Sequence, residues 1–227
     1  MLPVSAVVMD IEGTTTPIAF VLDVLYPYAR DRMPDFVRRR RGEPEVGRIM
    51  DEIRDIAEVW NDEAVVVRLC EWMAEDRKVT PLKELQGLIW EEGYHRGELV
   101  SPLYPDVAPA LRDWHGRGIR LSIYSSGSVL AQRLIYAHTV DGDLTPLLSA
   151  YFDTRVGHKR EADSYRRIAE LIGLPPREIL FLSDVREELD AAREAGWQTV
   201  WLTREGLSPL AAAHRRATRF DQIPVRP

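Results

Sequence analysis

The feature that most constrains the fold of this chain is a set of short apolar runs separated by longer stretches of helical periodicity. The clearest run, Ala6–Met9, is bounded by Ser5 and by Asp10. Runs of this length without polar alternation are typical of strands that are buried on both faces of a sheet. The predicted strands are Ala6–Met9, Ile119–Tyr124, Tyr151–Thr154, Ile179–Leu182 and Thr199–Leu202.

Helices are predicted between these strands. They cover residues Asp106–His115, Ser128–His138, Glu161–Ile172 and Glu187–Ala195. A regular alternation of strand and helix is typical of a parallel sheet with helices on both faces. We therefore expect an α/β fold with a Rossmann-like parallel sheet. The last residues, Ala217–Pro227, show no such pattern and are predicted to form an irregular tail.

One segment interrupts this alternation, because residues Phe20–Arg96 contain no convincing strand. Two sets of apolar residues recur there at helical spacing. They are Ile49, Ile53, Ile56 and Trp60 in one set, and Leu82, Leu85, Leu88 and Ile89 in the other. We therefore expect two domains in the 227 residues, with an α/β core formed by 1–16 and 100–227 and an all-helical insertion formed by 17–99.

The overall composition excludes several classes of partner. The formal net charge is −6, whereas a broad nucleic-acid surface needs the opposite sign, so nucleic acid is not an expected partner. The sequence shows no signal peptide, and no stretch approaches the ~20 apolar residues of a membrane span. We therefore expect a cytoplasmic protein that has no membrane partner and acts as a monomer.

Polar side chains follow the predicted strands at the ends where a ligand site is expected. Asp10 follows the first strand, and Asp184 lies just after the fourth. Ser125 and Ser126 follow the second strand. In open α/β sheets, ligands bind at the carboxyl edge of the strands, near the point where the strand order reverses. These residues are therefore predicted to meet at one site.

Asp10 and Glu12 can face one pocket, because Gly13 permits a tight turn directly after them. A carboxylate such as that of Asp10 can act as a nucleophile on phosphorus. The charges of phosphate and carboxylates must then be screened, and Mg²⁺ is a hard cation that suits oxygen ligands. The same short pattern is common at ordinary turns and caps, so the interpretation depends on the other motifs.

An anion site is predicted from two serines and one lysine. Ser125 and Ser126 precede a helix, where hydroxyls and free backbone N–H groups can hold a phosphate. The alternative is a plain helix cap by Ser126 or Ser128. Lys159 lies in a loop before another helix and can neutralise a bound phosphate as a point charge.

Asp184 is an acid at the end of a buried strand, which is costly unless the carboxylate is paired or binds a metal. We therefore expect Asp184 and Asp10 to share one Mg²⁺ ion. Glu188 lies one helical turn further on and is a candidate to support that ion through water. Its alternative role is that of a first-turn acid favoured by the helix dipole.

Taken in this order, the motifs resemble those of the haloacid dehalogenase superfamily of phosphohydrolases. Asp10–Thr14 is similar to its first motif, and Ser125 to the strand end of its second. Lys159 is similar to the lysine of the third motif, and Ser183–Asp184 to the acidic strand end of the fourth. The resemblance covers nearly the whole chain, and the helical insertion lies where such proteins carry a cap.

A narrower resemblance is to the enolase-phosphatase family of methionine salvage, whose members are also called acireductone synthases. Glu12 is part of it, because most of the superfamily has Asp at that position. The other segments that carry it are Tyr124–Ser128, Gly157–Glu161, Leu85–Trp90 and Ser164–Ala169. This resemblance implies a hydrolase that enolises 2,3-diketo-5-methylthiopentyl-1-phosphate and then releases phosphate, giving the acireductone 1,2-dihydroxy-3-keto-5-methylthiopentene.

The resemblance also implies roles for single residues. Asp10 would be the nucleophile and Glu12 the acid and base. One Mg²⁺ per subunit would be held by the side chains of Asp10 and Asp184 and by the backbone carbonyl of Glu12. The residues that would hold the phosphate are Ser125, Ser126 and Lys159. Where the superfamily usually has a second Asp in the fourth motif, this chain has Glu188.

Three alternatives stay open at this point. The first is a magnesium-dependent phosphatase of the same superfamily that acts on another small phosphoester. The second is a dehalogenase, which shares the fold and uses no metal, and which the acid at Asp184 disfavours. The third is a non-catalytic phosphoacceptor module, which also uses strand-end acids, Mg²⁺ and a lysine but lacks a large helical insertion.

Overall fold

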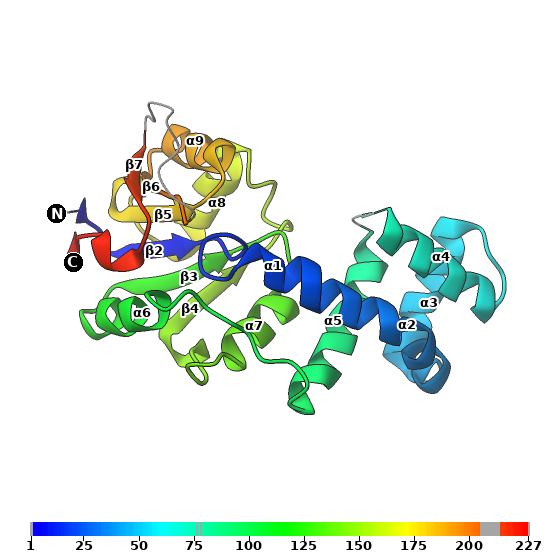
Figure 1. The fold of residues 1–227 in the computed structure, drawn as a ribbon. Coiled ribbons are helices and arrows are strands. Elements are labelled where there is room, and N and C mark those ends of the chain that lie inside the picture. The colour runs from blue at the N-terminus through cyan, green and yellow to red at the C-terminus, as the bar shows by residue number, and fades with distance from the viewer. Residues whose placement is uncertain (1, 76, 78, 205–213, 227) are drawn as a thin grey trace. The chain divides into compact units, whose positions relative to one another are not determined.

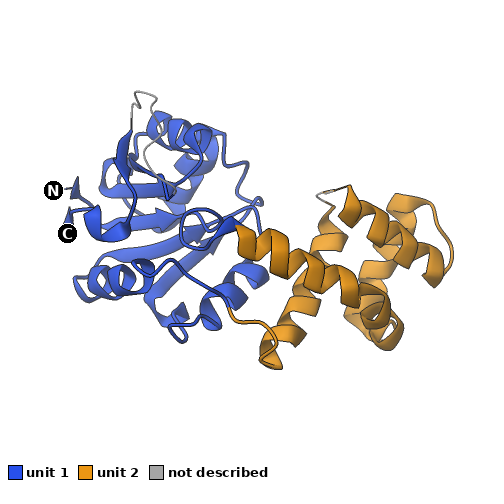
Figure 2. Cartoon of the chain, viewed as in Figure 1, with its two compact units in different colours: residues 1–18, 101–227 blue, residues 19–100 orange. Residues whose placement is uncertain are grey.

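A computed structural model describes residues 2–75, 77, 79–204 and 214–226. The chain separates into two compact units (Figure 2). We call residues 1–18 with 101–227 the core unit, and residues 19–100 the helical unit. That the helical unit acts as a cap stays a prediction.

A parallel sheet of six strands forms the centre of the core unit (Figure 1). Its strands, in spatial order, are β4 (Leu148–Phe152), β3 (Arg120–Tyr124), β2 (Ala6–Met9), β5 (Ile179–Ser183), β6 (Gln198–Leu202) and β7 (Arg215–Ala217). Every neighbouring pair in this sheet is parallel. The predicted α/β fold with a Rossmann-like parallel sheet is confirmed.

The strand predicted at Tyr151–Thr154 lies earlier in the chain, at Leu148–Phe152. It is the edge strand β4, so only one of its sides is paired within the sheet. Ser149 on this strand is exposed, whereas Leu148 and Phe152 are buried. Because its residues differ in burial, this strand does not form a continuous apolar run, and the sequence pattern does not locate it correctly.

Helices cover both faces of this sheet, as predicted. They are α6 (Val107–Gly116), α7 (Val129–Ala137), α8 (Ala162–Ile172) and α9 (Arg186–Glu194). One face packs against α8 and α9, through a buried cluster that includes Tyr124, Tyr165, Phe181 and Trp197. Figure 1 shows α6 and α7 on the opposite face. Because both faces are covered, the strands at the centre are buried and apolar.

The strand order places a reversal at the centre of the sheet. The chain moves from β2 outward through β3 to β4 on one side, and then returns to β5 on the other side of β2. Loops that leave neighbouring strands in opposite directions open a crevice at their carboxyl ends. The end of β2 is therefore the point of the core unit where a ligand site is most expected.

The helical unit contains no strand among its described residues. Its helices are α1 (Ile18–Phe20), a π-helix over Val21–Leu25, α2 (Tyr26–Arg40), α3 (Pro44–Ala57), α4 (Asp62–Ala74) and α5 (Thr80–His95). The predicted stripe on α5 is buried, but the stripe predicted from Ile49 to Trp60 is only half right. Ile56 and Trp60 are 51% and 81% exposed. Trp60 leaves the stripe because α3 ends at Ala57 and Glu58 adopts a left-handed conformation, which breaks the periodicity. Ile56 lies in the last turn of α3.

The prediction of an irregular C-terminal tail is wrong. Residues 215–226 add the strand β7, a 3₁₀ turn at Phe220–Gln222 and the short strand β8 (Val225–Arg226). Strand β8 pairs in parallel with β1 (Leu2–Pro3) near the N-terminus. Phe220 is fully buried and stacks on Trp114 of α6 with ring centroids 5.5 Å apart. Among the described helices, none combines the length and the apolarity needed to cross a membrane.

Because Phe220 fills the space between the tail and α6, we expect Phe220→Ala to leave a cavity and lower the unfolding free energy of the core unit by about 3–5 kcal/mol. The midpoint of urea unfolding, followed by tryptophan fluorescence, measures this loss. Leu171→Ala is the matched control, since Leu171 is 67% exposed. Equal midpoints for the two variants would show that the tail does not stabilise the core unit.

Candidate functional site

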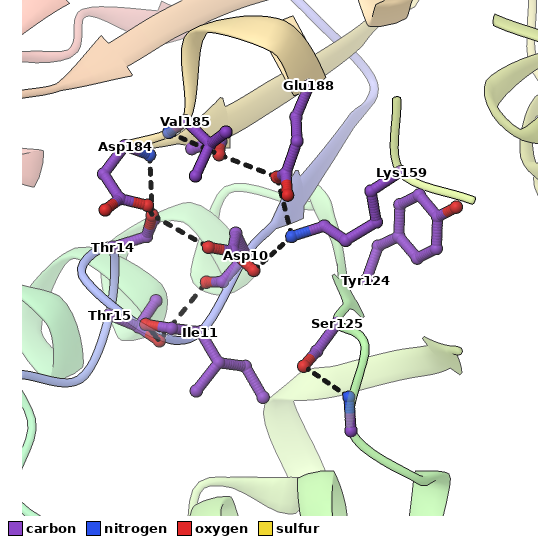
Figure 3. A network of polar contacts seen from close by, with 12 residues as sticks. Asp10, Ile11, Thr14, Thr15, Tyr124, Ser125, Lys159, Asp184, Val185 and Glu188 are labelled. Carbon is purple, nitrogen blue, oxygen red and sulfur yellow. Dashed lines mark hydrogen bonds and ion pairs between the residues drawn. The ribbon is translucent and has the colours of Figure 1, made fainter. Parts of the chain in front are cut away.

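The register of the sheet brings the predicted strand-end residues to one edge. Met9 of β2 lies opposite Ile123 of β3 and opposite Leu182 of β5. The next residues along each strand therefore leave the sheet at the same level, and the backbone N–H of Asp10 donates to the carbonyl of Leu182 at 2.9 Å. Asp10, Ser125 and Asp184 all follow these three central strands (Figure 3).

A closed turn follows Asp10. The carbonyl of Ile11 accepts hydrogen bonds from the N–H groups of Thr14, Thr15 and Thr16, at 3.1, 2.9 and 3.0 Å. The N–H of Gly13 donates to the carbonyl of Thr16 at 2.8 Å. Gly13 has φ +73, a left-handed conformation that other residues rarely adopt. The turn folds the chain back so that the side chain of residue 14 returns to Asp10.

The hydroxyl of Thr14 connects the two acids that were predicted to share a metal ion. Its Oγ1 lies 3.4 Å from Oδ2 of Asp10 and 3.3 Å from Oδ1 of Asp184. The backbone N–H of Asp184 donates to the same oxygen at 3.0 Å. Asp10 and Asp184 are thus brought together by one hydroxyl group (Figure 3). Sequence reasoning missed this contact, although a threonine after the glycine of the turn was a visible signal.

Lys159 lies between two carboxylates. Its ammonium forms an ion pair with Asp10, and its Nζ lies 2.7 Å from Oε2 of Glu188 (Figure 3). Only 9% of the lysine side chain is exposed. Burial by itself lowers the pKa of Lys159, but the two carboxylates outweigh this effect and hold the pKa above its ordinary value. Lys159 therefore stays charged in this buried position.

Glu188 contacts Lys159 and not the pair of acids at Thr14. Its Oε2 also accepts a hydrogen bond from the hydroxyl of Ser183 at 2.9 Å. Burial, and then the charge of Asp10, raise the pKa of Glu188 to about 7. Among its described contacts, Glu188 is the counter-ion of the lysine.

The serine loop after β3 is held by its own hydrogen bonds. The hydroxyl of Ser125 is buried and accepts from the N–H of Gly127 at 3.0 Å. Ser126 is exposed at the surface of the core unit. Of the two serines considered as caps, Ser128 is the one that caps α7, because its hydroxyl accepts from the N–H of Ala131 at 3.2 Å.

A buried glutamine that sequence reasoning missed supports this loop. The amide nitrogen of Gln132 donates to the carbonyls of Gly127 and Phe152, both at 2.9 Å. Gln132 lies one turn into α7, where it reads in the sequence as an ordinary helix residue. Its two contacts tie the serine loop to the end of β4.

The pKa values of Glu12 and Asp184 are both raised, and for the same two reasons. Burial, and then the charge of Asp10, raise the pKa of Glu12 above its ordinary value. The same two causes raise the pKa of Asp184 to about 6. Carboxyl groups that resist ionisation in this way are typical of sites that hold a proton or a cation.

The charges of the site fit a divalent cation with few protein ligands. The four carboxyl groups of Asp10, Glu12, Asp184 and Glu188 face a single ammonium, that of Lys159. Within the described ranges, no three His, Cys, Asp or Glu side chains gather as a metal site. Mg²⁺ is commonly bound through one or two carboxylates and keeps several waters, so the absence of such a cluster is compatible with the prediction that Asp10 and Asp184 are its side-chain ligands.

Comparisons with known proteins agree with this picture. The family model of the haloacid dehalogenase-like hydrolases matches residues 4–196. The chain is 54% identical to "Enolase-phosphatase E1" of Pseudomonas aeruginosa, over 98% of this chain and 99% of that protein. It is 51% identical to the protein of the same name from Pectobacterium atrosepticum, over 97% of this chain and 96% of that protein.

Solved structures show the same fold. The UTR4 protein of Saccharomyces cerevisiae superposes with a TM-score of 0.83 at 34% identity, covering 97% of this chain and all of that chain (100%). CbbY of Rhodobacter sphaeroides, solved in complex with phosphate, gives a TM-score of 0.60 at 17% identity, over 98% of this chain and 97% of that chain. A dehalogenase solved with an intermediate complex gives a TM-score of 0.60 at 16% identity, over 98% of this chain and 96% of that chain.

The turn at Gly13 generates a test of the pairing of Asp10 with Asp184. A Cβ at position 13 would lie 2.2 Å from Oδ2 of Asp184. We expect Mg²⁺ to raise the melting temperature of the unaltered protein, and we expect Gly13→Ala to displace Asp184 and to abolish this rise. The measurement is thermal unfolding with and without Mg²⁺.

Gly118→Ala is the matched control for this variant. Gly118 also has a positive φ, +83, but a Cβ there meets nothing within 4 Å. Both variants carry the backbone cost of about 1–2 kcal/mol, so only the clash with Asp184 distinguishes them. A Mg²⁺ response that survives in Gly13→Ala would show that Asp184 does not contribute to a metal site.

The raised pKa values generate a second test. Because the pKa of Asp184 rises from 3.8 to about 6 and that of Glu188 from 4.5 to about 7, the folded protein binds more protons than the unfolded chain in this range. We therefore expect the unfolding free energy of the metal-free protein to fall as the pH rises from about 4 to about 7. Thermal unfolding in a chelator at several pH values measures this change.

Mg²⁺ favours the ionised carboxylates, so it should raise the melting temperature more at about pH 7.5 than at about pH 5. Paired carboxyls with lowered pKa values, such as Asp62 and Glu98, change stability in the opposite sense, but around and below their ordinary pKa values of 3.8 and 4.5, so the fall in stability is read from about pH 5.5 upward. Glu188→Gln should flatten the pH dependence, and Glu187→Gln, at an exposed neighbouring position, should not. A chelated protein that gains stability from about pH 5.5 to about pH 7 would contradict the expectation.

Proposed function

Because this chain belongs to the haloacid dehalogenase-like hydrolases and, within them, to the enolase-phosphatase family, we propose that it converts 2,3-diketo-5-methylthiopentyl-1-phosphate to an acireductone and phosphate. The acireductone is 1,2-dihydroxy-3-keto-5-methylthiopentene, and enolisation of the substrate precedes hydrolysis. The observation that carries the proposal is the relatedness to enolase-phosphatases over nearly the whole chain, in a protein whose acids and lysine meet at one sheet edge.

Asp10 is the nucleophile in this proposal. One of its carboxylate oxygens forms a bond to phosphorus while the bond from phosphorus to the substrate oxygen breaks, which leaves an aspartyl-phosphate. Water then attacks phosphorus, the bond to Asp10 breaks, and inorganic phosphate leaves with the carboxylate restored. The position of Asp10 directly after the central strand supports this role, because the sheet holds its backbone rigidly.

Glu12 is the acid and base in this proposal. Its raised pKa supports the role, because the carboxyl then keeps a proton that it can give to the leaving oxygen. After that transfer, the carboxylate can take a proton from the attacking water. Positioned proton transfer of this kind contributes about 10²- to 10⁴-fold to the rate.

Ser125, Ser126 and Lys159 hold the phosphate group of the substrate. Lys159 supplies a positive charge that its pairing with Asp10 and Glu188 keeps ionised. The buried hydroxyl of Ser125 lies at the end of β3, beside the strand that carries Asp10. Charge developing on the phosphoryl oxygens is stabilised best by groups that are already in place.

One Mg²⁺ per subunit completes the site, held by the side chains of Asp10 and Asp184 and by the carbonyl of Glu12. When bound, it screens the negative charges of phosphate and carboxylate from one another. The excess of acids over cations supports this assignment. A cytoplasmic location and a monomeric state stay predictions.

We expect Asp10→Asn to abolish phosphate release while the protein stays folded, because the amide cannot attack phosphorus. The experiment supplies the diketo phosphate with Mg²⁺ and follows free phosphate together with the near-ultraviolet absorption of the enol. Glu187→Gln is the matched control, since it neutralises an exposed acid in the first turn of α9. Turnover by Asp10→Asn at the rate of the unaltered protein would disprove the role of Asp10.

The same assay distinguishes the alternatives. Release of phosphate from other small phosphoesters, but not from the diketo compound, would favour a different phosphatase. Activity that survives a chelator would argue against the Mg²⁺ site and favour a dehalogenase-like site. A long-lived phosphorylated protein without turnover would favour a phosphoacceptor module.

A further inference from the structure

We call the turn formed by residues 11–16 the catalytic turn. A buried arginine, Arg204, contacts this turn and has no part in the function described so far. The guanidinium of Arg204 donates twice to the backbone carbonyl of Thr14, from Nε at 3.0 Å and from Nη2 at 2.6 Å. Only 6% of its side chain is exposed. Arg204 follows β6, whereas Thr14 follows β2, so the contact joins the catalytic turn to another part of the core unit.

The other end of the same guanidinium is anchored by a buried acid. Nη1 of Arg204 lies 2.9 Å and 2.7 Å from the two carboxylate oxygens of Asp106. Asp106 precedes α6, its side chain is 3% exposed, and it also accepts from the N–H of Phe220 at 2.6 Å. The ring of Tyr104 packs against the guanidinium, with its centroid 4.2 Å from Cζ of the arginine. Asp106 and Tyr104 therefore hold the guanidinium of Arg204 in place beside the turn.

Thr14 is the residue through which this contact can act on the chemistry. Its carbonyl receives Arg204, while its hydroxyl lies between Asp10 and Asp184. A small rotation of the residue would move the hydroxyl away from one of the two acids. A displacement of about 1 Å that originates away from the reacting atoms can still cost about 10²-fold in rate.

We propose that Arg204, anchored by Asp106, is a positioning residue that fixes the turn around Thr14 and so sets the separation of Asp10 and Asp184. The proposal rests on the proposed function, in which these two acids hold the metal ion and one of them attacks phosphorus. Arg204 touches neither substrate nor metal in this scheme. Its effect passes through the backbone of Thr14.

The planar guanidinium is needed because it does two things at once. Its Nη1 donates to both oxygens of Asp106, and its Nε and Nη2 donate to the carbonyl of Thr14. A lysine ammonium is a point charge that can neutralise Asp106 but cannot span both groups. Arg204→Lys should therefore preserve the buried ion pair and lose the contact with the turn, whereas Arg204→Met would leave Asp106 buried without a partner.

We expect Arg204→Lys to lower kcat by about 10- to 100-fold with KM within about threefold of the unaltered protein. Its melting temperature without Mg²⁺ should stay close to that of the unaltered protein. The Mg²⁺ concentration that half-saturates the rise in melting temperature should increase, and this readout needs no substrate. Asp106→Asn weakens the ion pair that anchors Arg204. It should also lower kcat and raise the Mg²⁺ concentration at half-saturation.

Arg117→Lys is the matched control. Arg117 also pairs with an acid, Asp113, and donates to a carbonyl, that of Val225. It lies just before β3, at the amino edge of the sheet, which is the opposite edge from the site. Its ion pair is more exposed than that of Arg204, but its replacement also removes a contact from a guanidinium to a backbone carbonyl, and it does so without reaching the turn. The values of kcat and the Mg²⁺ midpoint should therefore stay within about twofold.

Two results would overturn the proposal. One is a folded Arg204→Lys protein whose kcat and Mg²⁺ midpoint equal those of the unaltered protein, and the other is an equal loss in Arg117→Lys. If Arg204→Lys does not fold, Asp106→Asn decides by the same comparison. An unaltered protein that is inactive on the diketo phosphate would refute the proposed function instead, and the Mg²⁺ midpoints would still test Arg204.

Discussion

The site depends on an imbalance of charge that the fold confines to one edge of the sheet. Among the described residues, Asp10, Glu12, Asp184 and Glu188 lie near one ammonium, that of Lys159, which is buried and whose pKa is held above its ordinary value. Burial, and then the charge of Asp10, raise the pKa values of Asp184 and Glu188, so the site gains stability from a proton or a divalent cation. The same imbalance of charge therefore suits the site to metal and acid–base chemistry.

The sheet can carry this cost because the acids stand on well-supported backbone. Asp10 follows a strand that is paired on both sides and buried on both faces. The turn that follows is closed by three hydrogen bonds to Ile11, and Gly13 lets it pass close to Asp184. Arg204 fixes the same turn from behind. Each of these contacts limits how far the acids can move apart.

The sequence predicts the parts of this site that depend on local pattern. Asp10 is recognisable because a short apolar run ends there, and Lys159 because it precedes a helix in the order that the motifs require. The contact between Thr14 and Arg204 is not predictable in this way, because it joins residues 190 positions apart in the chain. The structure of the tail is not predictable for the same reason, since Phe220 stacks on Trp114, a residue of α6 that lies more than a hundred positions earlier in the chain. Long-range contacts of single residues leave no periodicity in a sequence.

Glu188 shows how one extra methylene group can change the role of an acid. The superfamily usually has Asp at this position, and a shorter side chain on the first turn of α9 would reach less far from the helix. The longer side chain extends to Nζ of Lys159 at 2.7 Å while it accepts a hydrogen bond from Ser183. A phosphate that binds Lys159 meets an ammonium already paired with Glu188 and Asp10, and must compete with both carboxylates for it. In the proposed phosphate site, protonation of Glu188, whose pKa is raised to about 7, would weaken its hold on the lysine, so phosphate binding and proton uptake at Glu188 would favour each other.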